Sequence, residues 1–165
     1  MSAGRIYLDH HATTPCDPDV LKAMWPWFAQ RVGNAAITSH EFGAEAREAV
    51  EHAREQIAAA IKARPEEIIF TSGATESNNL AIKGVMQQTR GRGHLIVNAA
   101  EHRAVLDPAK RLAREGCELT VLPVDRFARV PPSDVAAAIG PATALVSVMA
   151  ANNEVGTLNP IAEIA

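Results

Sequence analysis

The turn from Ser72 to Thr75 is the stretch of this sequence best suited to bind an anion. An apolar, β-branched run at 68–70 precedes it, and a helical pattern begins immediately after it. The first N–H groups of a helix have no partner within the helix, and the helix dipole adds partial positive charge there. Small side chains would let a phosphate group come close to these donors. Taken alone, the residues favour a plain turn, with Ser72 or Thr75 as the helix N-cap.

Polar side chains also follow the three later strands that we expect in this sequence. Glu101 and His102 follow the strand expected at 94–99, and Asp125 follows the one at 118–122. Asn152 and Asn153 follow the strand expected at 143–149. Ligands of open parallel sheets bind at the carboxyl ends of the strands. An anion site, an imidazole, a carboxylate and an amide at that edge would make a cofactor pocket.

Each of these side chains also has a simpler explanation. His102 could be a surface loop histidine, or it could close the turn into its helix. Asp125 lies in a polar loop, and Asn152 and Asn153 are typical turn residues. These alternatives remain open from the residues alone.

The other reactive side chains favour structural roles. His10 and His11 are adjacent, so they would point to opposite sides of an extended segment, and we expect no metal site. Cys16 and Cys117 are too few for a disulfide framework or a zinc cluster. The four lysines all fall in helical patterns, where a solvated face explains them: Lys22, Lys62, Lys83 and Lys110.

Hydrophobic periodicity places these residues on alternating strands and helices. Expected strands cover 67–71, 94–99, 118–122 and 143–149. Expected helices cover 18–27, 40–61, 75–90, 104–115 and 133–139, and another begins at 161–165. Gly91, Arg92 and Gly93 should end the helix at 75–90. The alternation predicts an α/β fold with parallel strands and helices on both faces of the sheet.

Composition excludes several classes of protein. A chain of 165 residues with 47% apolar and 21% charged residues is typical of one globular domain. The net charge of −3 gives no footprint for nucleic acid. Residues 1–6 contain no signal-peptide core, and no apolar run could span a bilayer. We therefore expect a cytoplasmic protein.

Four motifs, in order, resemble the cysteine desulfurases of class V aminotransferase type. They are YLDHHATTP at 7–15, FTSGATESNN at 70–79, EHRAVL at 101–106 and NNEVGT at 152–157. One departure lies at 125–130, where the family usually has a glycine before the valine, and it affects only a turn.

The resemblance implies a fold-type I pyridoxal-phosphate enzyme that takes sulfur from L-cysteine and releases alanine. The sulfur would pass on as a persulfide, for iron–sulfur cluster assembly or other sulfur transfer. Carried over by position, Ala74 and Thr75 would hold the phosphate of pyridoxal 5′-phosphate. His102 would stack on the ring and help to move protons, and Asn153 would hydrogen-bond the ring hydroxyl oxygen.

The resemblance also predicts the domain organisation. Residues 1–15 would contribute to the small domain of the family, and 16–165 would form the N-terminal part of the large domain. That part would be an incomplete three-layer α/β/α structure with a mainly parallel sheet. The strand at 67–71 would then have no neighbour, whereas the three later strands could still pair.

Three functional groups of the family lie beyond the Asn152-Asn153-Glu154 motif: the cofactor-linking lysine, the aspartate facing the ring nitrogen, and the persulfide cysteine. No lysine or cysteine of this chain matches them by position. We therefore expect an N-terminal part that is inactive alone. Its partners would be L-cysteine, a sulfur-acceptor protein, and a second copy or a complementing C-terminal fragment. The alternatives are a non-catalytic binding or scaffold protein, and another class V enzyme such as a selenocysteine lyase.

Overall fold

The computed structural model describes residues 4–90 and 92–165 and consists of two units, Met1–Phe70 and Thr71–Ala165. The first unit contains helices α1, Pro18–Ala29, and α2, Glu41–Ile61, followed by the short 3₁₀ helix η1, Pro65–Glu67. Both predicted helices of this unit are therefore confirmed. None of the described helices is long and apolar enough to cross a membrane.

Helix α2 begins at a closely packed loop. His40 is its N-cap, and the Nδ1 atom of His40 accepts a hydrogen bond from the Gly43 N–H at 3.1 Å. A Cβ atom on Gly43 would lie only 1.6 Å from the carbonyl oxygen of Ile37. A Cβ atom on Gly33 would similarly lie 2.1 Å from the carbonyl oxygen of Phe42. Only glycine allows the backbones to approach this closely.

The segment at 67–71, predicted as the first strand, is not a strand. Its beginning belongs to η1, and residues 68–71 pair with no other strand in the described chain. Arg54 of α2 donates a hydrogen bond to the Ile68 carbonyl, and its guanidinium lies 5.0 Å from the Phe70 ring centroid. The prediction fails because a β-strand needs a neighbouring strand for its backbone groups. This outcome agrees with the expectation that the segment has no neighbour here.

The second unit contains a three-stranded parallel sheet with the order β2-β1-β3. Its strands are β1, His94–Asn98, β2, Glu118–Leu122, and β3, Thr143–Ser147. Its helices are α3, Ala74–Gln88, α4, Arg103–Arg114, α5, Pro132–Ala138, and α6, Ile161–Ile164. The predicted strands and helices of this unit are thus present, with ends shifted by one or two residues. Gly91 lies outside the described residues.

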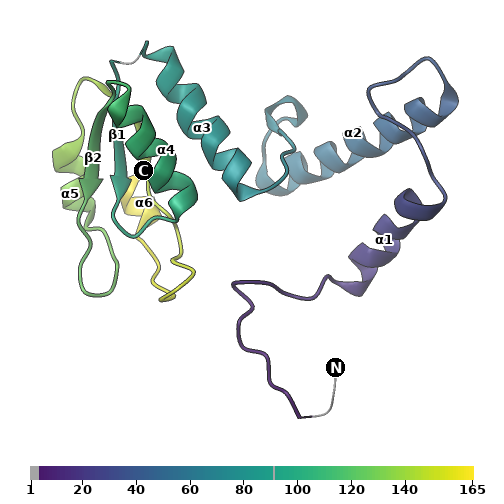
Figure 1. The fold of residues 1–165 in the computed structure, drawn as a ribbon, viewed down its shortest axis with the longest axis horizontal. Coiled ribbons are helices and arrows are strands. Elements are labelled where there is room, and N and C mark those ends of the chain that lie inside the picture. Colours follow the sequence, from purple (N-terminus) through teal and green to yellow (C-terminus); the bar gives the residue numbers. More distant parts are fainter. Residues whose placement is uncertain (1–3, 91) are drawn as a thin grey trace. The chain divides into compact units, whose positions relative to one another are not determined.

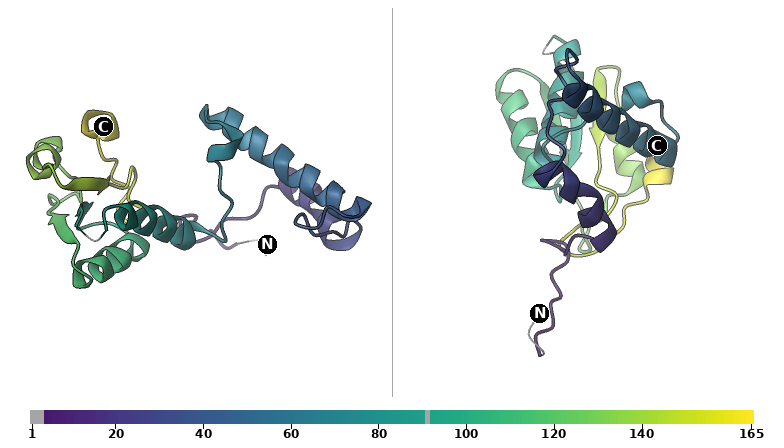
Figure 2. Two further views of the ribbon diagram at one scale, coloured as in Figure 1. Left: turned by 90° about the horizontal axis from the view of Figure 1, so that it is seen from above. Right: turned by 90° about the vertical axis from the view of Figure 1, so that its right-hand side faces the viewer.

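Two apolar clusters cover opposite faces of this sheet. Leu95 and Val97 of β1 pack with the α3 and α4 side chains, including Met86. Ile96 packs on the other face, with Val135 of α5. Successive residues of a strand point to opposite faces, so one apolar strand supplies both clusters. Figures 1 and 2 show α4 and α5 on opposite sides of the strands. The predicted three-layer α/β/α arrangement, in an incomplete form, is confirmed.

Candidate functional site

Helix α3 begins with a cluster of free hydrogen-bond donors. Its N-cap is Gly73, with φ 154° and ψ −179°, a conformation that is essentially restricted to glycine. The alternative N-caps, Ser72 and Thr75, are therefore wrong. Within the described chain, the N–H groups of Ala74, Thr75 and Glu76 donate to no protein acceptor. Three donors thus remain at the positive end of the helix dipole.

Ser72, the residue before the N-cap, is hydrogen-bonded to the first turn of α3. The Oε2 atom of Glu76 accepts hydrogen bonds from the N–H and the hydroxyl of Ser72, both at 2.7 Å. Both hydrogen bonds lower the pKa of the Glu76 carboxyl, and the bond from the Ser72 N–H has the larger effect. The hydroxyl of Thr75 makes no hydrogen bond to other described residues, so it adds a fourth donor to the cluster.

Thr75 and His102 line one groove between α3 and α4, with a volume of about 400 Å³. Its charged lining residues are Lys83 of α3 and Arg103, Asp107 and Arg111 of α4. Arg103 and Asp107 form an ion pair at 3.4 Å. The structure therefore brings together two of the predicted site residues, in a groove with more cationic than anionic side chains. Ala74 adjoins Thr75 in the first turn of α3.

Asn153 is exposed and does not line this groove. Its neighbour Asn152 is buried and organises the turn after β3. The Nδ2 atom of Asn152 donates to the Ala100 carbonyl at 3.1 Å, and its Oδ1 atom accepts from the N–H groups of Glu154 and Val155. Asn152 thus has the simpler turn role, and the role of Asn153 stays a prediction.

Asp125 also stabilises a turn. Its Oδ1 atom accepts from the N–H groups of Phe127 and Arg129, at 2.8 and 2.9 Å. Both hydrogen bonds lower the pKa of the Asp125 carboxyl, and the bond from the Arg129 N–H has the larger effect. It does not line the groove of Thr75 and His102.

The remaining candidates lie apart from the groove. His10 contacts Thr14 at 3.3 Å through Nδ1, and among the described residues no three His, Cys, Asp or Glu side chains gather as a possible metal site. Cys16 is exposed, and Cys117 is buried in the core. Of the four lysines only Lys83 lines the groove.

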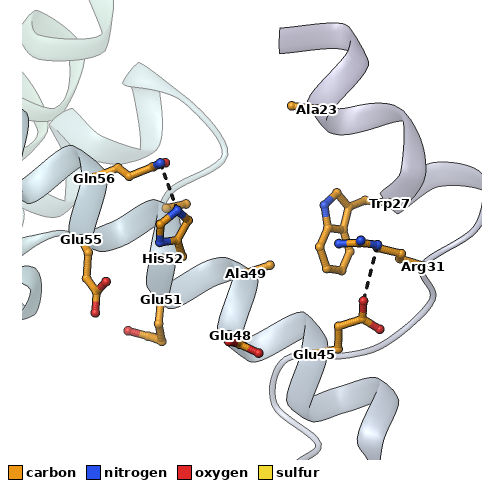
Figure 3. Close-up of a pocket in the computed structure, with 11 residues that line it drawn as sticks. Ala23, Trp27, Arg31, Glu45, Glu48, Ala49, Glu51, His52, Glu55 and Gln56 are labelled. Carbon is orange, nitrogen blue, oxygen red and sulfur yellow. Dashed lines mark hydrogen bonds and ion pairs between the residues drawn. The ribbon is translucent and has the colours of Figure 1, made fainter. Parts of the chain in front are cut away.

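The first unit contains a second groove, of about 810 Å³, lined by residues of α1 and α2 and by Arg31 of the loop between them (Figure 3). Arg31 lies 3.4 Å from Glu45, between Nε and Oε1, and its guanidinium lies 5.4 Å from the Trp27 ring centroid. No predicted site residue lines this groove, so it is not part of the candidate site.

Sequence reasoning missed a buried polar network beside His102. The Oε1 atom of Glu101 accepts from Nδ2 of Asn98 at 2.6 Å and from the Met149 N–H at 2.5 Å. Oδ1 of Asn98 accepts from the Ala100 N–H at 2.7 Å. The network joins the loop after β1 to the loop after β3. Its sequence signals are Glu101, a polar residue after the expected strand, and Asn98, an amide at the end of a wholly buried strand.

Burial raises the pKa of the Glu101 carboxyl, and the Met149 N–H opposes this effect. The folded protein therefore binds the Glu101 proton more tightly than the unfolded chain. We expect the contribution of the Glu101 carboxyl to the free energy of unfolding to decrease as the pH rises from its ordinary pKa of 4.5 towards the raised pKa of the folded protein. The neutral variant Glu101→Gln should lack this loss, so its free energy of unfolding should improve relative to the parent as the pH rises.

Urea unfolding of both proteins between pH 4 and pH 8 measures the difference at each pH. The exposed side chain of Glu163 on α6 provides the control, Glu163→Gln. A constant difference between Glu101→Gln and the parent across this range would contradict the prediction.

The sequence pattern of the Aminotransferase class-V family matches residues 6–165. The chain belongs to this family. Among curated class-V relatives, the cysteine desulfurase IscS of Anaeromyxobacter sp. strain K is 54% identical over 160 residues, covering 96% of this chain and 40% of the relative. The human cysteine desulfurase is 51% identical over 160 residues, covering 96% of this chain and 35% of the relative. The chain thus spans about 40% of the length of such relatives or less.

Solved structures agree with this class-V assignment. One described as a NifS-like protein has a TM-score of 0.92 and 38% identity, covering 97% of this chain and 44% of the other. Another, SspA in complex with cysteine, has a TM-score of 0.89 and 39% identity, covering 96% and 46%. The resemblance to the cysteine desulfurases, and to only part of their length, is confirmed.

The donors at the start of α3 fit the phosphate group of pyridoxal 5′-phosphate, the cofactor that the class-V family implies. Three N–H groups and the Thr75 hydroxyl are all donors, as an anion with several acceptor oxygens requires. The open space around Gly73 leaves room for the anion, because no heavy atom lies within 4 Å of a Cβ placed there. The imidazole of His102 lines the same groove.

Proposed function

We propose that this chain is the N-terminal portion of a pyridoxal-phosphate-dependent cysteine desulfurase, which converts L-cysteine to alanine and transfers the sulfur to an acceptor protein. The observation that carries the proposal is the free donor cluster of α3 beside His102, in a class-V chain. The names of the similar relatives support the activity, and the SspA complex supports L-cysteine as the substrate. Sulfur for iron–sulfur clusters is the proposed use.

Each proposed residue has a separate task. The N–H groups of Ala74, Thr75 and Glu76 and the Thr75 hydroxyl bind the phosphate and so fix the cofactor's orientation. His102 stacks on the cofactor ring, and its imidazole helps to transfer protons during the reaction. Asn153, from the exposed loop after β3, donates a hydrogen bond to the ring hydroxyl oxygen. When bound, pyridoxal phosphate supplies the electron sink for bond changes at the substrate.

Exposed apolar side chains and an open sheet edge support a covering partner. Helix α1 has no buried residue, although its Trp25 and Phe28 are 65% and 73% exposed. Strand β3 lies at an edge of the sheet, where backbone groups can pair with another strand.

We propose that a complementing C-terminal portion, a second copy of the chain, or both cover these surfaces. In the complete enzyme, 1–15 would contribute to the small domain and 16–165 to the large domain. No lysine here matches the cofactor-linking lysine of the family, so the chain alone should not turn over. The two free cysteines, Cys16 and Cys117, are compatible with the reducing cytoplasm that we propose as its location.

Reconstitution tests this function directly. The chain is mixed with the C-terminal remainder of the similar Anaeromyxobacter enzyme, pyridoxal phosphate and L-cysteine, and sulfide and alanine are measured. Both products should form in the mixture, and neither should form with either polypeptide alone. Cofactor binding without any sulfide release would count against the desulfurase assignment. Selenium release from selenocysteine alone would favour a selenocysteine lyase.

Thr75 provides a matched pair of variants for the cofactor site. Thr75→Val removes the hydroxyl but keeps the shape of the side chain, whereas Thr75→Ser keeps the hydroxyl. A hydrogen bond to a charged group contributes about 1.5–3 kcal/mol. Thr75→Val should therefore weaken the binding of pyridoxal phosphate in the mixture about tenfold to hundredfold, and Thr75→Ser should largely preserve it.

Titration with pyridoxal phosphate, followed by its visible absorbance, gives the dissociation constants. Equal constants for the parent and Thr75→Val would show that this hydroxyl does not contact the phosphate.

A further inference from the structure

We propose that His102 carries its single ring proton on Nε2 and presents it as a hydrogen-bond donor, while Nδ1 is fixed as an acceptor by helix α4. Uptake of a proton by the ring would then require release of the α4 cap. The catalytic meaning of this inference rests on the proposed function, but its test does not.

The geometry of the α4 N-terminus identifies the nitrogen that lacks a proton. His102 is the N-cap of α4, and its Nδ1 atom lies 3.0 Å from the backbone nitrogen of Ala104. A backbone N–H can only donate, so Nδ1 must supply the lone pair. A neutral imidazole has one donor and one acceptor nitrogen. The proton of the neutral ring therefore resides on Nε2.

The surroundings explain why this hydrogen bond persists. Ala104 is buried, so without Nδ1 its N–H would lack an acceptor in a buried position. The His102 carbonyl also accepts from the N–H groups of Val105 and Leu106, at 2.9 and 3.1 Å. The backbone and the side chain of His102 are thus both hydrogen-bonded to the first turn of α4.

The two ring nitrogens consequently have different functions. Nδ1 faces the helix, and Nε2, across the ring, is the nitrogen left to interact with a ligand in the groove shared with Thr75. A neutral imidazole at a helix N-terminus can serve as a hydrogen-bond donor in catalysis. The ring can accept a proton only on Nδ1, and that step breaks the bond to Ala104.

Charged side chains line the same groove as this imidazole. They are Lys83 of α3 and Arg103, Asp107 and Arg111 of α4. Glu101 is the residue before His102. The Oε1 atom of its carboxylate accepts hydrogen bonds from Asn98 Nδ2 and the Met149 N–H. The test is made at pH 8, because the proposal concerns the neutral ring.

Long-range ¹H–¹⁵N correlation spectra of the ¹⁵N-labelled full chain distinguish the two neutral tautomers. The variant His102→Asn identifies the His102 signals by their absence, and Asn keeps a good N-cap. His102 should show the Nε2–H pattern. His40, whose Nδ1 atom accepts from Gly43, should show it too, while the exposed His11 should show an averaged pattern. A proton on Nδ1 of His102, or an average like that of His11, would overturn the proposal.

Amide exchange of Ala104 provides a second measurement on the same chain. His102→Ala removes the acceptor, so exchange at Ala104 should accelerate between about twofold and tenfold. His102→Asn should stay close to the parent. Unchanged exchange in His102→Ala would also overturn the proposal. Neither measurement uses pyridoxal phosphate, so a failure of cofactor binding and a failure of this inference are distinguishable.

Discussion

Gly73→Ala is expected to lose most of the phosphate affinity of the α3 N-terminus. Gly73 has φ 154° and ψ −179°, which a residue with a Cβ adopts only at a cost of about 1–3 kcal/mol. The substituted turn should relax to another conformation and redirect the N–H groups of Ala74 and Thr75. Binding must then restore the strained turn, so the affinity for pyridoxal phosphate should fall by about fivefold to more than hundredfold.

Gly84→Ala is the matched control for this change. Gly84 lies inside the same helix, and a Cβ placed there has no heavy atom within 4 Å, as at Gly73. Its backbone is helical, so alanine should stabilise α3 by about 0.5–1 kcal/mol and leave the affinity unchanged. Titration of both variants with pyridoxal phosphate, in the mixture used for Thr75, compares them directly. Equal affinities for the two variants would exclude the proposed role of the Gly73 conformation.

Gly43→Ala should cause the largest loss of stability in the first unit. The new Cβ would lie 1.6 Å from the Ile37 carbonyl oxygen and 3.1 Å from that of Asn34. These are backbone atoms, so no side-chain rotation can relieve the overlap. The loop before α2 must move, which also disturbs the bond from the Gly43 N–H to His40. We expect the free energy of unfolding of this unit to fall by about 3 kcal/mol or more.

Tryptophan fluorescence during urea unfolding measures this effect, because both tryptophans, Trp25 and Trp27, lie in α1 of the first unit. Ala44→Gly, at the next position, is the control. It removes a Cβ instead of adding one, and the helix propensity of glycine should cost about 1 kcal/mol. If Gly43→Ala were no less stable than Ala44→Gly, the close contact with the Ile37 carbonyl would not constrain this position.

Local sequence signals predicted the features that depend on neighbouring residues. Periodic apolar residues located α2 and α4, and short segments rich in apolar residues located β1, β2 and β3. The Ser72–Thr75 turn was a candidate anion site because its residues adjoin a helix start, and the structure has free N–H donors there. The ordered motifs identified the class-V family. All of these signals arise within a few residues of the chain.

Which distant residues meet could be read only from the folded chain. The segment at 67–71 has the composition of a strand, but strand formation depends on a partner that lies elsewhere in sequence. The Glu101 carboxylate became a link between loops only because the parallel sheet brings Met149, 48 residues away, to its side. The packing of α3 against α4 likewise placed Thr75 and His102 in one groove and left Asn153 outside it. Hydrogen-bond partners and burial are set by such long-range contacts, which neither composition nor local spacing encodes.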